Sequence, residues 1–162
     1  PYNSESWANS KGENQYRRSV YTFWKRSSGY PSMITFDASP RSVCTPRRIR
    51  TNTPLQALVT LNDSVYVDLA GHFAARMARG GGNVNSQIAR GFEMMLFKKI
   101  PEQTLQSLVK LYQTAFVQFK NDKPAAKEFA GENNNDHAPE EKAALKLVAN
   151  AMLNLDEVIT KN

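Results

Sequence analysis

Cysteine is almost absent from this 162-residue chain, since Cys44 is the only one. A single cysteine excludes an internal disulfide, and it supplies neither the paired thiolates of a typical zinc site nor a haem attachment motif. Histidine is also scarce, and His72 and His137 have no partners at metal-ligand spacing. The sequence therefore predicts no metal site.

Long hydrophobic runs are missing as well. No stretch of about 18 apolar residues occurs, so we predict no transmembrane helix. The first residues lack a basic region followed by an apolar one, which is the pattern of a secretion signal. Because the chain opens on Pro1 rather than Met, we expect it to be a fragment of a longer protein whose N-terminal region is a partner of this one.

Acidic residues are nearly absent from one stretch, which runs from Arg17 to Arg50. It contains eight basic residues and a single acid, Asp37, a net charge of +7, whereas the rest of the chain nets −1. All of the excess positive charge thus lies in about a fifth of the sequence. We therefore look for the function of the protein first in this stretch.

Aromatic residues alternate with the basic ones in this stretch, a pattern that can bind an anionic glycan, a small anion or a nucleic acid. Guanidinium groups fork onto carboxylate, sulfate or phosphate oxygens, and aromatic faces add stacking. The candidate anion-binding residues are Arg17, Arg18, Trp24, Arg26, Tyr30, Arg41, Arg47, Arg48 and Arg50. The competing interpretation, which we prefer because arginine greatly outnumbers lysine here, is that these arginines clamp an irregular segment onto the rest of the protein.

Two further residues of the basic stretch are candidates for chemistry. Nearby arginines would stabilise a thiolate at Cys44 and make it reactive, although a lone cysteine is more often a small buried apolar residue. Asp37 is predicted to be ionised and to pair with arginine as a structural anchor. Near the other end of the chain, Asp156 and Glu157 are predicted to pair with the same arginines. No catalytic residue is predicted.

Helical patterns begin at Thr53. Thr53 and Asp63 are predicted N-caps, and Pro54 suits the first helical position. Apolar residues then recur at helical spacing. Leu55, Leu58 and Leu61 form the first apolar face, and Leu145, Val148 and Met152 lie on the last one. We expect these faces to be buried between helices. The expected helices cover about 54–61, 63–79, 85–98, 101–120, 124–130 and 139–159.

The predicted fold class is mainly α: a small helical bundle with an irregular N-terminal arm rich in arginine and aromatic residues. One or two short strands are an option, at Ser19–Trp24 and Met33–Phe36. We expect the arm, residues 1–52, to pack on the bundle, residues 53–162, as one domain.

Four sequence segments resemble one family: RRSVYTFWKR, TFDASPRSVC, RRIRTNTPLQALVTLND and LNLDEVIT. Together they are similar to the C-terminal part of a planctomycete-type bacterial domain family of unknown function, often fused to cytochrome-c-like modules. The similarity spans Tyr16–Arg79 and Ala143–Thr160. It departs from the family pattern at Ser39-Pro40-Arg41, where the family has Pro and Asp before Arg.

The resemblance implies a periplasmic, extracellular or cell-envelope location, and no activity comes with it. It implies no cofactor in this fragment, with haem in an associated upstream module. We expect a structural or binding module of a larger envelope or secreted protein. The alternatives are part of a hydrolase acting on an anionic or carbohydrate substrate, with its site completed outside this fragment, and a nucleic-acid binder. The last rests on the isoelectric point of about 9.5 alone and is disfavoured.

Overall fold

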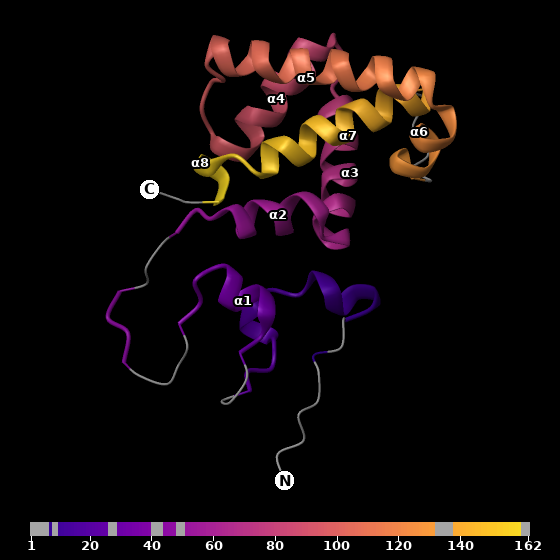
Figure 1. The fold of residues 1–162 in the computed structure, drawn as a ribbon. Coiled ribbons are helices and arrows are strands. Elements are labelled where there is room, and N and C mark those ends of the chain that lie inside the picture. The colour runs from indigo at the N-terminus through magenta and orange to yellow at the C-terminus, as the bar shows by residue number, and fades with distance from the viewer. Residues whose placement is uncertain are drawn as a thin grey trace. The chain divides into compact units, whose positions relative to one another are not determined.

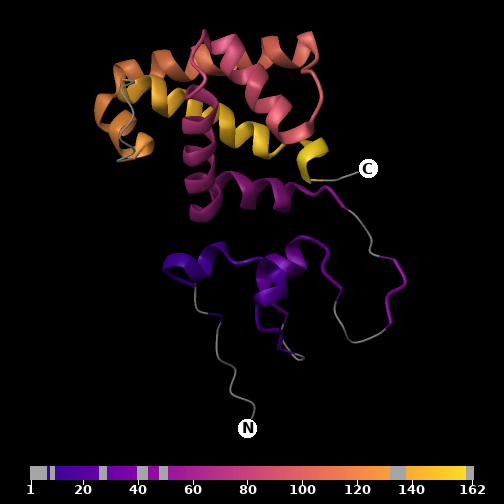
Figure 2. The ribbon, with the colours of Figure 1, turned by 180° about the vertical axis from the view of Figure 1, so that it is seen from behind.

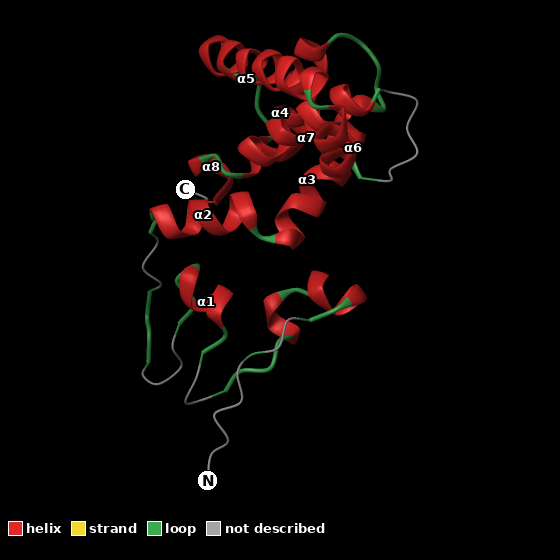
Figure 3. Cartoon of the chain, turned by 45° about the vertical axis from the view of Figure 1, so that its right-hand side comes forward, coloured by secondary structure: helices red, strands yellow, loops and turns green. Residues whose placement is uncertain are grey.

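The computed structural model describes residues 7, 10–25, 29–39, 44–47, 51–131 and 138–159. Within these residues the chain is helical and forms no strand (Figure 3), which confirms the mainly α prediction. The chain divides into two compact units, Pro1–Gln56 (unit 1) and Ala57–Asn162 (unit 2). The boundary falls inside helix α2 (Pro54–Asn62). Packing of the arm on the bundle stays a prediction.

Unit 1 contains short helical turns where the sequence left strands open. Two 3-10 helices, η1 (Gly12–Tyr16) and η2 (Ser19–Tyr21), precede the single-turn helix α1 (Pro31–Thr35). The extended conformation predicted at Met33–Phe36 is therefore wrong. Pro31 is already fixed at a helical φ at the N-terminus of α1, and the Thr35 hydroxyl donates back to its carbonyl at 3.0 Å.

Unit 2 is a helical bundle in which α7 (Pro139–Leu153) is the central element. Its most extensive packing is with three other helices, and it crosses one of them, α3 (Ser64–Ala78), in opposite views (Figures 1 and 2). The remaining elements are α3 (Ser64–Ala78), α4 (Val84–Leu96), α5 (Glu102–Asn121), α6 (Lys123–Ala130) and α8 (Asp156–Ile159).

The core of unit 2 combines large apolar side chains with small ones. Met77, Ile88, Val148 and Met152 are fully buried between α3, α4 and α7. Buried alanines on α7 provide no bulk of their own, so neighbouring helices approach its backbone closely. This helix therefore fixes where α3, α5 and α6 lie.

Helix α2 reverses the predicted pattern of burial. Leu55, Leu58 and Leu61 are 57%, 58% and 41% exposed, whereas Gln56 and Thr60 are buried. The buried side is held by hydrogen bonds rather than by apolar contact. The prediction that the leucine face is buried is therefore wrong.

The last predicted helix is interrupted at Asn154. Its backbone leaves the helical region at φ −96°, ψ 5°, and α8 begins two residues later. The Thr60 hydroxyl donates to the Asn154 side-chain oxygen at 2.6 Å, and the Asn150 amide donates to the Leu61 carbonyl at 3.1 Å. These bonds tie the end of α7 to α2 and account for the break.

The end of α3 depends on an arginine from the next helix. Arg90 on α4 donates to the carbonyl oxygens of Met77, Gly80 and Gly81 at 2.8, 3.3 and 3.2 Å. A cation at this point also matches the negative end of the helix dipole. A Cβ at Gly80 would lie 2.2 Å from the Arg90 guanidinium carbon, so glycine leaves the space that the guanidinium fills.

The predicted N-cap at Asp63 is confirmed, because its carboxylate accepts from the Val65 amide at 2.9 Å. We expect Asp63→Ala to lower the free energy of unfolding of unit 2 by about 1 kcal/mol, since a free amide loses its acceptor. Asp63→Asn, which keeps the acceptor, should remain within about 0.5 kcal/mol of the parent. Urea unfolding followed by far-UV circular dichroism measures both, and an equal loss in the two variants would contradict a capping role.

Candidate functional sites

Gln56 is the hydrogen-bonding centre of unit 1, and only 1% of its surface is exposed. Its side-chain amide donates to the Thr35 carbonyl at 2.8 Å, to the Thr51 hydroxyl at 3.0 Å and to an Asp37 carboxylate oxygen at 3.3 Å. The same carboxylate oxygen accepts from the Thr51 amide and hydroxyl at 2.8 and 2.7 Å. We call these residues, with Thr53, the Gln56 network.

Thr53 completes the Gln56 network as a reciprocal cap. The Gln56 backbone N–H donates to the Thr53 hydroxyl at 3.3 Å, and the Thr53 backbone N–H donates to the Gln56 side-chain oxygen at 3.0 Å. This is the capping-box arrangement, so the predicted Thr53 cap is confirmed. The network joins residues 35–37 to residues 51–53 and thereby closes the segment that carries Cys44.

The structure describes some of the predicted anion-binding residues. Arg17, Arg18 and Arg47 are exposed, and within the described part of the chain their side chains form no hydrogen bond or ion pair. Four other candidates lie outside the described residues, and for them both the clamping and the anion-binding interpretations stay predictions: Arg26, Arg41, Arg48 and Arg50.

Trp24 and Tyr30 are half-buried, as Trp7 is. The rings of Trp7 and Tyr30 meet edge to face with 5.1 Å between their centroids, and the Lys25 ammonium lies 4.6 Å above Trp7. This cluster supports the unit internally. Other aromatic residues point outward, since Tyr21 and Phe23 are 72% and 73% exposed.

Cys44 is exposed. The interpretation of this cysteine as a small buried apolar residue is therefore wrong, and its reactivity stays a prediction.

Two of the three acids that were predicted to pair with arginine have other partners among the described residues. The Asp37 carboxylate belongs to the Gln56 network, which gives it an anchoring role through hydroxyl, amide and carboxamide donors. Glu157 pairs with Lys98 of the same unit, with 2.6 Å between the Lys98 ammonium and the carboxylate oxygen. Pairing of Asp156 or Glu157 with an arginine of the arm stays a prediction.

Unit 1 carries the whole net charge of the protein. It contains nine basic and three acidic residues, a net charge of +6, whereas unit 2 contains twelve of each. A field of one sign therefore surrounds unit 1 and not unit 2.

Unit 2 contains a pocket of about 380 Å³ that sequence reasoning did not find. Its floor is a stripe of small residues on α3, and α7 forms one wall. Tyr112 of α5, Ala130 of α6 and the start of α4 complete it. The floor residues recur at helical spacing and are Gly71, Ala74, Ala75 and Ala78. That spacing is the signal in the sequence that could have indicated a helix face without side-chain bulk.

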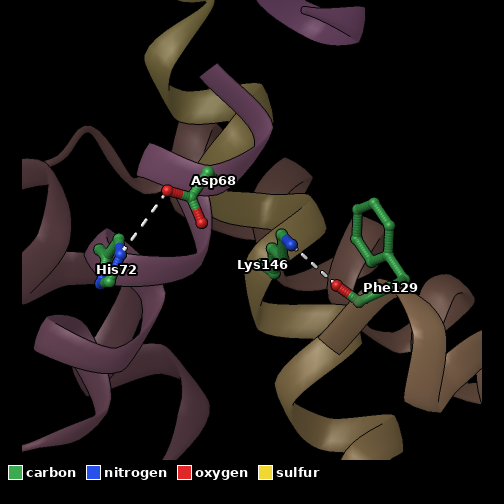
Figure 4. Close-up of polar contacts among 4 residues, drawn as sticks. All are labelled: Asp68, His72, Phe129 and Lys146. Atoms are coloured by element: carbon green, nitrogen blue, oxygen red, sulfur yellow. Dashed lines mark hydrogen bonds and ion pairs between the residues drawn. The ribbon is translucent and has the colours of Figure 1, made fainter. Parts of the chain in front are cut away.

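Lys146 lines the pocket, and Figure 4 shows its side chain directed toward the Phe129 carbonyl. Its ammonium donates to the Phe129 carbonyl at 2.8 Å and lies 4.9 Å from the centre of the Phe129 ring. Burial lowers the pKa of Lys146, and the charge of Asp68 opposes that shift. Asp68 itself lies 3.7 Å from His72, four residues along α3.

Comparison with protein families matches residues 1–112 to PSD1, described as a protein of unknown function (DUF1553). The match covers more than half of the chain. This chain belongs to the DUF1553 family. A search of curated proteins found no match, and a search of solved structures found none either.

The DUF1553 match confirms the family seen in the sequence over Tyr16–Arg79, and the second similar segment, Ala143–Thr160, lies beyond the matched residues. Unit 1 and the α3 floor of the pocket fall inside the match, whereas α6 and α7 fall outside it. Among the described residues of this DUF1553 member, no helix combines the length and apolar character needed to cross a bilayer. Nor do those residues gather three metal-ligating side chains at one point.

The ionisation of Tyr112 should make the free energy of unfolding of this DUF1553 chain depend on pH in the alkaline range. Burial and then the charge of Glu141 raise the pKa of Tyr112 above 10.0. The folded form therefore holds this proton more tightly than the unfolded form, so the stabilisation is complete below pH 10.0 and is lost as pH rises through the folded pKa. We expect the free energy of unfolding of Tyr112→Phe to fall less steeply above pH 10 than that of the parent.

Urea unfolding of both proteins at a series of alkaline pH values measures this difference. The opposing contribution of Lys146 and the parallel one of Tyr66 are present in both proteins and cancel in the comparison. Identical slopes would show that Tyr112 ionises as it does in the unfolded chain.

Proposed function

We propose that this chain is a binding module of a larger cell-envelope or secreted protein and that unit 1 binds an anionic glycan. The observation that carries the proposal is the concentration of the entire net charge in unit 1, where Arg17, Arg18 and Arg47 are exposed. An exposed guanidinium group offers a planar pair of donors that matches carboxylate and sulfate oxygens.

Exposed aromatic side chains beside these arginines support the same role. Tyr21 and Phe23 lie within six residues of Arg17 and Arg18 and present most of their surface to solvent. Exposed apolar surface of this kind next to charge is typical of an interaction site. Charge provides long-range attraction, and the aromatic surface adds contact once the ligand has arrived.

Chromatography on immobilised anionic glycans tests the proposal. The columns carry dextran sulfate, polygalacturonate or neutral dextran, and the salt concentration at elution is measured for each. We expect retention on the two anionic glycans and none on neutral dextran. In Arg17→Gln/Arg18→Gln, the slope of log affinity against log salt should fall by about two, because two charge contacts are lost.

A matched double variant separates this site from the overall charge. Arg76→Gln/Arg79→Gln removes two exposed arginines from the C-terminal end of α3 in unit 2, one in its last turn and one at its C-cap, and its elution should equal that of the parent. If both variants lose the same amount of retention, the interaction depends on net charge alone. That result would overturn a binding site in unit 1. Stronger retention on duplex DNA than on either glycan would instead assign a nucleic-acid ligand.

A further inference from the structure

The pocket of unit 2 has the form of a ligand site and is independent of the function proposed for unit 1. Its volume of about 380 Å³ lies within the range of small-molecule pockets. From Gly71 to Ala78 the α3 floor is about 10 Å long, at about 1.5 Å per residue. Gly71 and alanines expose no polar side-chain atom, so this floor suits an apolar ligand body.

The two ends of the pocket differ in chemistry. At the Gly71 end lies Lys146, since a Cβ on Gly71 would be 3.4 Å from the Lys146 Cε atom. At the other end, Asn83 and Gln87 are engaged within the protein: Asn83 caps α4 by accepting from Ser86, and Gln87 donates to the Gly82 carbonyl. The Gly71 end therefore presents a cationic donor, Lys146, held beside an apolar floor.

Lys146 retains hydrogen-bonding capacity. An ammonium group has three donors, and the structure shows one of them on the Phe129 carbonyl. The charged residues that line the pocket are Glu141, Lys142 and Lys146, a net charge of +1. Asp68, which acts on Lys146 from α3, is half-exposed and lies beside His72. An anionic group is therefore favoured over a cationic one at this end.

We propose that this pocket binds an amphipathic monocarboxylate, with its carboxylate on Lys146 and its alkyl chain along the α3 floor toward Ala78. A cavity of about 380 Å³ holds about twelve non-hydrogen atoms, at about 30 Å³ each. A linear carboxylate of about ten carbons has that size. Because Lys146 is the cation that lies against the α3 floor, and Asn83 and Gln87 at the second end are bonded within the protein, a single charged group is specified.

Isothermal titration of the whole chain with decanoate tests this proposal. We expect one site with a Kd of about 0.01 to 1 mM, in line with the affinity that a ligand of this size gains per atom. Decan-1-ol and decyltrimethylammonium, which share the alkyl chain, should bind at least about tenfold more weakly. Equal binding of the three ligands would overturn the role of Lys146.

Variants locate the binding. Lys146→Met keeps the length of the side chain and removes its charge, so the affinity for decanoate should fall about 10- to 100-fold. Lys110→Met removes an exposed charge from α5 outside the pocket and should leave the affinity unchanged. Ala75→Leu should block the floor of the pocket. If Ala75→Leu does not fold, Lys146→Met still tests the site. No saturable binding by about 10 mM, or an unchanged affinity in Lys146→Met, would overturn the site.

Discussion

Replacing Gln56 with alanine is expected to destabilise unit 1 by about 3 to 5 kcal/mol, although the change removes only one uncharged side chain. The Thr35 carbonyl and the Thr53 amide lose their partners, and the Asp37 carboxylate loses one of its donors. Buried polar groups that lose partners cost more than the bond itself contributes.

Tryptophan fluorescence measures this effect selectively, because Trp7 and Trp24 are the only tryptophans and both belong to unit 1. The midpoint of urea unfolding by fluorescence should fall sharply in Gln56→Ala, while the helical signal of unit 2 changes little. Gln113→Ala, an exposed position on α5, is the matched control and should leave both signals unchanged. A fluorescence midpoint within the error of the parent would show that the Gln56 network does not hold unit 1 together.

Val148→Asp is expected to unfold unit 2. Val148 is fully buried on α7, the helix that contacts α3, α5 and α6. A carboxylate at this position has no cation beside it in the core cluster, and its burial costs several kcal/mol. That cost is comparable to the whole stability of a typical domain, about 5 to 15 kcal/mol. Far-UV circular dichroism should therefore show a loss of most helical signal at room temperature.

The same substitution at an exposed valine is the control. Val117 lies on α5 and is 57% exposed, so Val117→Asp should keep the helical signal and change the free energy of unfolding by less than about 1 kcal/mol. Val148→Thr, which keeps the shape and adds a hydroxyl, should cost about 1 to 3 kcal/mol. A folded Val148→Asp protein with nearly parental stability would contradict the central position of α7.

Helix positions were predictable from the sequence where local signals coincided with burial. Thr53 and Asp63 carry side chains that cap a helix by bonds within the next few residues, and such bonds need no knowledge of the fold. The spacing of Leu145, Val148 and Met152 likewise placed one face of α7 in the core. These features depend on neighbours in sequence, which is why they could be read directly.

Features that depend on distant residues were not predictable. Periodicity assigned Leu55, Leu58 and Leu61 to a buried face of α2, but the buried side carries Gln56 and Thr60, whose partners lie 21 and 94 residues away. The break at Asn154 has the same origin. The pocket was not predicted either, because it is the space that five helices leave unfilled.

The contact between Gly80 and Arg90 has a consequence for the history of the family. Any larger residue at position 80 must displace the guanidinium group and release three carbonyl oxygens at once. The two positions should therefore vary together among DUF1553 sequences. A relative with alanine or serine at the first position is expected to have lost arginine at the second and to end the preceding helix in another way.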